Sequence, residues 1–181
     1  TTAIAAQAMT NILENLNGMA AIGVGVGLMT IVGQCMGADR KDEAVYYIKK
    51  LSVIAEVAII VSCLLVFALI RPVTVLGGME PASAKMCFHM VTWITLVKPI
   101  VWTLAFVPAY GLRAAGDVKF SMITSCLVMW LCRFCLCVIL IRFLGFGPMG
   151  VWIGMFADWT VRAVIFTWRF HSRRWLRYKV I

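Results

Sequence analysis

Five long stretches of the chain are almost free of charged residues, and shorter charged or turn-rich segments separate them. The stretches cover residues 11–36, 51–70, 86–111, 120–141 and 149–170. At 1.5 Å per helical residue, each is long enough to cross the roughly 30 Å hydrocarbon core of a bilayer. The pattern therefore predicts five membrane-spanning segments.

These segments are expected to be helices rather than barrel strands. Inside hydrocarbon every backbone N–H and C=O must be paired, and the stretches are too long and too uniformly apolar for strands. We expect an all-α fold, a polytopic transmembrane helical bundle over residues 1–170. A basic cytoplasmic tail is expected to follow at residues 171–181.

The composition excludes an ordinary soluble domain. Of the 181 residues, 62% are hydrophobic and only 14% are charged, whereas soluble domains carry about 25% charged residues. The mean hydropathy is +0.93. The formal net charge of +9 does not indicate nucleic acid as a partner, because the basic residues lie mainly at the ends of apolar stretches. The expected partner is the lipid bilayer.

Lys and Arg are divided unequally between the two sides of the predicted bundle. One side receives 11 of them and the other receives 3: Arg40, Lys41, Lys49, Lys50, Arg113, Lys119, Arg169, Arg173, Arg174, Arg177 and Lys179 against Arg71, Lys85 and Arg142. The richer side is expected to be cytoplasmic. This predicts a multi-pass protein of the cell membrane with its C-terminus in the cytoplasm and its N-terminus outside.

The start of the chain carries neither an initiator Met nor a basic, signal-like segment. The first helical pattern also begins with no flanking loop. We therefore expect the sequence to be the C-terminal part of a longer, transporter-like protein.

Neither a metal site nor an enzyme is expected. Cys132, Cys135 and Cys137 lie in the middle of an apolar stretch, with no second CxxC and no nearby His. His89 and His171 have no partner at a catalytic spacing, and we expect no cofactor. The glycines of the Gly23–Gly27 run, with the pairs Gly33/Gly37 and Gly150/Gly154, are typical of close helix packing, and helix bending is the alternative.

Ionisable residues inside the apolar stretches are the strongest functional signal, because each is costly unless it faces protein or water. Lys98 lies in the third stretch directly before Pro99, and a proline removes a helical hydrogen bond. We expect a bent third helix that lines a cavity. The alternative is a Lys98 that is paired structurally or extends to the interface.

Three further charges are predicted to form one buried cluster. Arg133 and Asp158 lie at similar depths on neighbouring antiparallel segments, and Arg162 follows Asp158 by four residues on the same helix face. We expect an Arg133, Asp158 and Arg162 cluster that acts mainly as a structural clamp. Direct participation in transport is the alternative.

The first segment carries a polar stripe on an otherwise apolar helix, formed by Gln7, Asn11, Glu14, Asn15 and Asn17. Such a stripe usually faces protein or water. Glu14 is the best acidic candidate for contact with a cation or a proton. An interfacial carboxylate with no further role is the alternative.

Three motifs run along the chain in order: Val32-Gly-Gln-Cys-Met-Gly-Ala38, Leu112-Arg-Ala-Ala-Gly-Asp117, and Gly150-Val-Trp-Ile-Gly154 with Asp158-Trp159 and Arg162-Ala163. In this combination the sequence resembles the multidrug and toxic compound extrusion (MATE) family of secondary antiporters. Members have twelve helices in two six-helix lobes, and this chain resembles the last five helices of the second lobe.

The resemblance implies efflux of organic cations or similar compounds, driven by inward Na⁺ or H⁺ through alternating access. It also implies a first, N-terminal lobe as a partner. Arg113 and Asp117 match the family's loop between two helices, where a role in loop geometry or cytoplasmic gating is expected. Several members bind the coupling ion through an acid on the third of these helices, but here that helix has Lys98 and no Asp or Glu.

Two other functions remain open from the residues alone. A flippase for lipid-linked saccharides would use a similar cavity with a more basic lining, which Lys98 and Arg133 would suit. A membrane scaffold subunit would use the buried charges for structure only.

Overall fold

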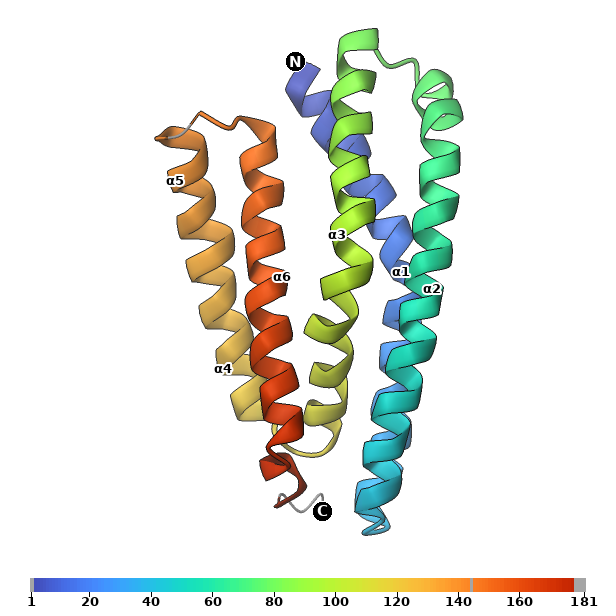
Figure 1. The fold of residues 1–181 in the computed structure, drawn as a ribbon, viewed down its shortest axis with the longest axis vertical. Helices are drawn as coiled ribbons and strands as arrows, with labels where there is room; N and C mark the ends of the chain where they lie inside the picture. The colour runs from blue at the N-terminus through green and yellow to red at the C-terminus, as the bar shows by residue number, and fades with distance from the viewer. Residues whose placement is uncertain (1, 144, 178–181) are drawn as a thin grey trace.

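The computed structural model describes residues 2–143 and 145–177, and the described residues form a bundle of long helices (Figure 1). Three helices come first in the chain: α1 at Thr2–Gly37, α2 at Lys41–Leu76 and α3 at Pro81–Ala114. One further span follows in three parts: α4 at Val118–Val128, a π-helical segment η1 at Met129–Cys135, and α5 at Leu136–Arg142. Helix α6 covers Pro148–His171, and a short 3₁₀ helix, η2, covers Arg174–Arg177.

The five predicted apolar stretches each fall within one of these spans. Among the described residues, five helices are long and apolar enough to cross a membrane, with α4, η1 and α5 counted as one helix over Val118–Arg142. The prediction of an all-helical membrane bundle is confirmed. The helices extend beyond the apolar stretches because polar turns at their ends, such as residues 41–50 of α2, continue the same backbone hydrogen bonding.

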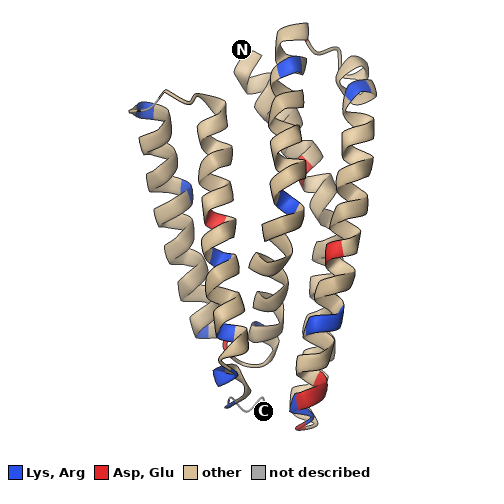
Figure 2. Ribbon diagram, viewed as in Figure 1, with Lys and Arg blue, Asp and Glu red and all other residues tan. Residues whose placement is uncertain are grey.

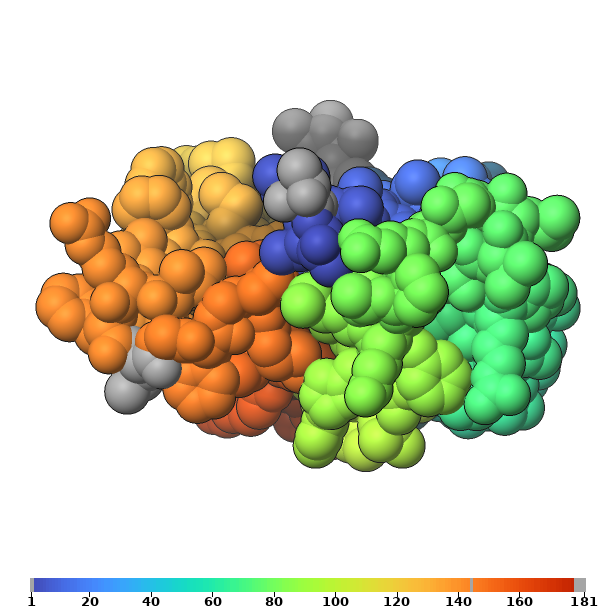
Figure 3. Space-filling model, turned by 90° about the horizontal axis from the view of Figure 1, so that it is seen from above, coloured from blue at the N-terminus to red at the C-terminus, as the bar shows by residue number. Residues whose placement is uncertain are grey.

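Helix α3 lies at the centre of the bundle. It packs against α1 and α2 on one side and against α6 on the other, while the α4–η1–α5 span packs chiefly on α6. Seen from above, α2 and α5 occupy opposite ends of an elongated outline (Figure 3). The start of α1 and the end of α6 lie at opposite ends of the bundle, as an odd number of spans requires (Figure 1).

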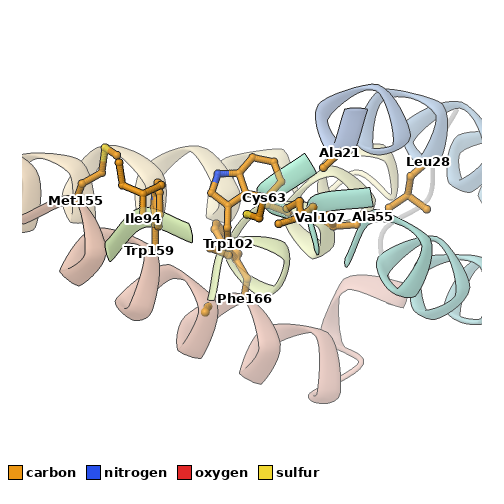
Figure 4. Packing of buried hydrophobic residues seen from close by; sticks show 14 of the residues in the cluster. Ala21, Leu28, Ala55, Cys63, Ile94, Trp102, Val107, Met155, Trp159 and Phe166 are labelled. Atoms are coloured by element: carbon orange, nitrogen blue, oxygen red, sulfur yellow. The ribbon is translucent and has the colours of Figure 1, made fainter. Parts of the chain in front are cut away.

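A continuous apolar core joins the helices along α3. Ile94 and Trp102 of α3 are buried with Leu28 of α1, Cys63 of α2 and Phe166 of α6 (Figure 4). Large apolar side chains are also exposed on the outer faces of the helices, among them those of Leu64, Ile100 and Val164. Outward apolar faces are expected of spans that lie in lipid.

Close packing through glycine is confirmed at some of the predicted positions. A Cβ added at Gly154 would collide with the Cys137 side chain, and one at Gly150 would lie 2.9 Å from Ile141 Cγ1. These glycines therefore let α6 approach α5. Within the Gly23–Gly27 run, a Cβ added at Gly25 would lie 2.6 Å from Tyr110 Cδ2, so α1 approaches α3 closely there. No described atom lies within 4 Å of a Cβ at Gly23, Gly27, Gly33 or Gly37, so these four show no close packing within the described residues.

Most charged residues lie toward the ends of the bundle. Figure 2 shows blue Lys and Arg gathered near the end that carries the α1–α2 turn, the α3–α4 turn and the last turn of α6. A few charges lie between the two ends, and among them Glu14 and Arg133 line the candidate site.

Candidate functional site

A pocket of about 270 Å³ lies between α1, α3, η1 and α6. Helix α1 contributes polar atoms, α3 and α6 contribute aromatic rings, and η1 contributes a cation. The lining residues are Glu14, Asn15, Gly18, Ile22, Trp102, Phe106, Tyr110, Arg133, Met155 and Trp159. The pocket combines one carboxylate, one guanidinium and four aromatic rings, a set suited to an amphipathic aromatic ligand.

Glu14 of the pocket is held by Lys98 of α3. Lys98 Nζ donates to Glu14 Oε1 at 2.7 Å and to the Glu14 backbone carbonyl at 3.1 Å. The Lys98 side chain is 0% exposed and that of Glu14 is 18% exposed. The two are 84 residues apart in sequence. Lys98 is thus a buried, paired residue, the structural alternative considered from the sequence, and the carboxylate it holds is the member of the pair that lines the pocket.

Two features of the surroundings accommodate the Lys98 ammonium. Its Nζ lies 5.5 Å from the centroid of the Trp102 ring, a cation–π distance. A Cβ added at Gly18 would lie 3.4 Å from the same Nζ, so the missing side chain leaves room for the ammonium beside α1. These contacts help to compensate for the free-energy cost of removing the ammonium from water.

Pro99 lies next to Lys98 inside α3, which continues through both Pro99 and Pro108. Neither proline has a backbone N–H, so the carbonyls four residues earlier, at Thr95 and Leu104, lose their usual donors. Lys98 and the pocket-lining aromatic residues therefore lie on a stretch of α3 whose backbone hydrogen bonding is locally interrupted.

The aromatic residues that line the pocket were not among the predicted site residues, although the sequence carries a signal for them. Trp102, Phe106 and Tyr110 follow Lys98 at intervals of four residues, which places all four on one helix face. Met155 and Trp159 repeat the same interval on α6. A Lys followed by three aromatic residues at this spacing indicates a helix face that lines a pocket more specifically than any single residue does.

Asp158 and Arg162 form a buried ion pair within α6. Arg162 Nε donates to Asp158 Oδ1 at 2.9 Å, and its Nη2 donates to the Ser125 backbone carbonyl at 3.0 Å. The guanidinium also lies 5.6 Å from the centroid of the Phe106 ring. Asp158 Oδ2 is buried and has no hydrogen-bond partner among the described residues. This pair links α6 to α4 and α3.

Arg133 does not join that pair, so the predicted three-residue cluster is wrong. Arg133 is exposed, and its Nη2 donates to Met155 Sδ at 2.9 Å. Arg162, one turn from Asp158, donates to Oδ1 of that carboxylate, and Arg133 does not reach the unpartnered Oδ2. The π-helical turns of η1 also change the direction of the side chain from that of an ideal α-helix. Arg133 thus lies on the wall of the Glu14 pocket.

The polar stripe of α1 is divided between two pockets. Glu14 and Asn15 line the pocket described above, whereas Gln7 and Asn11 line a second one of about 410 Å³ with Pro148 of α6. Gln7 Oε1 accepts a hydrogen bond from Trp152 Nε1 at 3.1 Å.

The predicted loop motif lies where α3 turns into α4. Arg113 Nε donates to Ser121 Oγ at 3.0 Å, and Asp117 Oδ2 accepts from Arg169 Nε at 2.7 Å. The Asp117 side chain is 1% exposed. These contacts hold the α3–α4 turn against the last turn of α6.

No group of three or more His, Cys, Asp or Glu residues in the described part of the chain is arranged to hold a metal ion. The charges of the candidate site instead pair with each other or face the pocket.

Comparison with known proteins places the chain in a family. The family model described as MatE matches residues 1–139. A probable multidrug resistance protein NorM of Thermotoga maritima is 22% identical over 169 residues, which cover 93% of this chain and 36% of that protein. No solved structure matches the chain significantly.

Two further relatives match shorter segments at higher identity. An uncharacterized transporter YisQ of Bacillus subtilis is 39% identical over 67 residues, 37% of this chain and 15% of that protein. A probable multidrug resistance protein NorM of Rhodopseudomonas palustris is 36% identical over 61 residues, 34% of this chain and 13% of that protein.

The matched segments thus span about a third or less of the length of these relatives. The family match itself covers most of the chain and includes the Val32–Ala38 and Leu112–Asp117 motifs. The resemblance that these motifs indicate is confirmed: the chain is a multi-pass membrane protein that belongs to the MatE family, the multidrug and toxic compound extrusion family.

Proposed function

We propose that the chain forms part of a secondary active transporter that exports amphipathic organic cations by antiport with Na⁺ or H⁺, through alternating access. Family membership and the names of two multidrug resistance relatives support transport rather than an enzymatic activity. The C-terminus lies in the cytoplasm, an orientation supported by the Lys and Arg gathered at that end of the bundle (Figure 2). A second helical lobe completes the cavity.

The observation that carries this proposal is the Glu14 carboxylate among aromatic rings. A cationic aromatic compound in the pocket gains an ionic contact with Glu14 and ring contacts with Trp102 and Trp159. Lys98 occupies Glu14 Oε1, but a carboxylate has two oxygens and can accept several hydrogen bonds. Glu14 can therefore hold Lys98 and face a ligand at the same time.

Ethidium efflux from cells that express the intact protein tests the proposal. Glu14→Gln alone would leave Lys98 buried without its carboxylate, so the informative variant is Glu14→Gln combined with Lys98→Met. We expect this double variant to reach the membrane and to lose most gradient-dependent efflux. Glu56→Gln is the matched control, because Glu56 is the carboxylate within the apolar stretch of α2 and is not among the residues that line this pocket.

Efflux at the wild-type rate in the double variant would contradict the role of Glu14. Absence of gradient-dependent efflux from the wild-type protein, for ethidium and for other aromatic cations, would contradict the transport function itself. Dissipating the Na⁺ and H⁺ gradients separately identifies the coupling ion.

A further inference from the structure

A second basic site lies between α2 and α3, toward the end of the bundle opposite to the one where most Lys and Arg gather. Figure 2 shows blue on both helices toward that end. The site is a pocket of about 230 Å³ lined by Ile70, Arg71, Thr74, Ala84, Lys85 and Phe88. None of these residues lines the Glu14 pocket, so the two sites are separate.

The two cations of this pocket are not neutralised by the protein. Neither Arg71 nor Lys85 has a carboxylate within 4 Å among the described residues. The Arg71 guanidinium is instead placed over α3, with its Cζ 5.9 Å from the centroid of the Phe88 ring. Like charges that share a pocket repel each other, and an anion between them replaces that repulsion with attraction. The pocket therefore favours an anionic ligand.

The depth of the pocket matches the boundary between hydrocarbon and lipid headgroups. Arg71 directly follows the apolar stretch that ends at residue 70, and Lys85 directly precedes the one that begins at residue 86. Helices α2 and α3 pack against each other and are joined by a short turn, so both side chains lie at the same edge of the apolar layer. Basic pockets between membrane helices at headgroup level are suited to lipid phosphates.

An apolar surface continues from the pocket toward the middle of the span. Phe67 lies four residues before Arg71, and Phe88 lies three residues after Lys85. Each ring is therefore about one turn deeper than the cation of its own helix. The two ring centroids are 5.8 Å apart, and Phe67 is exposed, as is Leu64 one turn farther along α2. Two cations followed by an exposed apolar surface match the order of phosphate and acyl chain in a lipid.

We propose that Arg71 and Lys85 bind the phosphate of an anionic phospholipid, with an acyl chain lying along Phe67 and Leu64. The guanidinium donates paired hydrogen bonds to two phosphate oxygens, and the ammonium donates to the same phosphate. The bound lipid joins α2 to α3 at this end of the bundle. Phosphatidylglycerol suits the pocket better than phosphatidylcholine, because the choline group would bring a further positive charge to two cations.

Native mass spectrometry of the purified intact protein measures the Kd of each added lipid. In the wild type we expect phosphatidylglycerol to bind more tightly than phosphatidylcholine with the same acyl chains. Arg71→Gln with Lys85→Gln is expected to raise the Kd of phosphatidylglycerol at least about tenfold and to abolish this preference, because each lost hydrogen bond joins two charged groups. Both side chains are exposed, so the variant is expected to fold, which size-exclusion chromatography checks.

Lys119→Gln with Arg142→Gln is the charge-matched control. It removes the same total charge, but from opposite ends of the Val118–Arg142 span, where the two side chains are too far apart to hold one phosphate. The Kd of phosphatidylglycerol should stay within about twofold of the wild-type value. Inorganic phosphate at millimolar concentration should not displace the lipid, because it lacks the acyl chain that contacts the apolar surface.

Equal weakening of phosphatidylglycerol binding in the two double variants would overturn the proposal, since general attraction between a basic protein and an anionic lipid would then explain the binding. Equal affinity of the wild type for the two lipids would also overturn it. Displacement of phosphatidylglycerol by inorganic phosphate would assign the pocket to a soluble anion instead of a lipid. Because lipid binding is measured without transport, these outcomes are independent of the proposed function.

Discussion

Two of the buried ion pairs in the described part of the bundle differ in what they join. Lys98 and Glu14 connect α3 to α1, and the carboxylate of that pair faces a pocket. Asp158 and Arg162 lie one turn apart on α6, and Arg162 is further held by the Ser125 carbonyl. Both pairs satisfy charges that lipid would not tolerate. Only the first pair places a charge where a ligand could reach it.

A structural charge and a functional charge thus differ in how exposed the side chain is and in which helices its ion pair joins, rather than in depth within the membrane. The Asp158 side chain is 1% exposed, whereas that of Glu14 is 18% exposed. We therefore expect changes at Asp158 to alter stability and changes at Glu14 to alter both stability and ligand binding.

The largest effect is expected for Glu14→Gln. The Lys98 ammonium would remain fully buried without a counter-charge, which costs about 3–5 kcal/mol. The double variant with Lys98→Met removes that charge and should recover most of the loss. Thermal unfolding of the intact protein in detergent measures the stability of the single and the double variant. Equal destabilisation of the single and double variants would show that the pair is not coupled.

A smaller effect is expected for Asp158→Asn, because Arg162 keeps the Ser125 carbonyl and the Phe106 ring as partners. Loss of the charged hydrogen bond corresponds to about 1.5–3 kcal/mol. Less folded protein should accumulate in membranes, measured by fluorescence-detected size exclusion. Efflux per folded molecule should stay at the wild-type level. Normal abundance with lost efflux would instead give Asp158 a direct role in transport.

The smallest effect is expected for Asp117→Asn, at the end of the bundle. The Arg169 side chain is 12% exposed, more than that of Lys98 or Arg162, and it also lies 4.4 Å from the centroid of the Phe120 ring. We expect a loss of about 1 kcal/mol and faster proteolysis of the α3–α4 turn, with ligand affinity unchanged. A change in ligand affinity would show that this end of the bundle is coupled to the pocket.

The fold could be predicted from the sequence because the bilayer imposes a simple requirement. Long apolar stretches must form helices, and the five predicted stretches each lie within one helical span. Hydropathy alone does not set the helix ends, since α1 begins at Thr2 and α2 at Lys41, outside their apolar stretches. Charged and polar turns there continue the helix without changing the hydropathy signal.

The site could be predicted only in part, for reasons of sequence distance and backbone geometry. Asp158 and Arg162 are four residues apart, so helix periodicity alone places them together. Glu14 and Lys98 are 84 residues apart, and their pairing depends on how α1 and α3 pack. Arg133 was misplaced because ideal helix geometry ignores the π-helical turns of η1.

The most direct test of the account compares the two ion pairs by ligand affinity. Glu14→Gln with Lys98→Met neutralises the pair that lines the pocket, and Asp158→Asn with Arg162→Gln neutralises the pair within α6. We predict that the Kd of the intact protein for the cationic dye tetramethylrhodamine methyl ester rises at least about tenfold in the first double variant and stays unchanged in the second. An equal rise in both variants, or a rise confined to the second, would contradict the assignment of ligand binding to the Glu14 pocket.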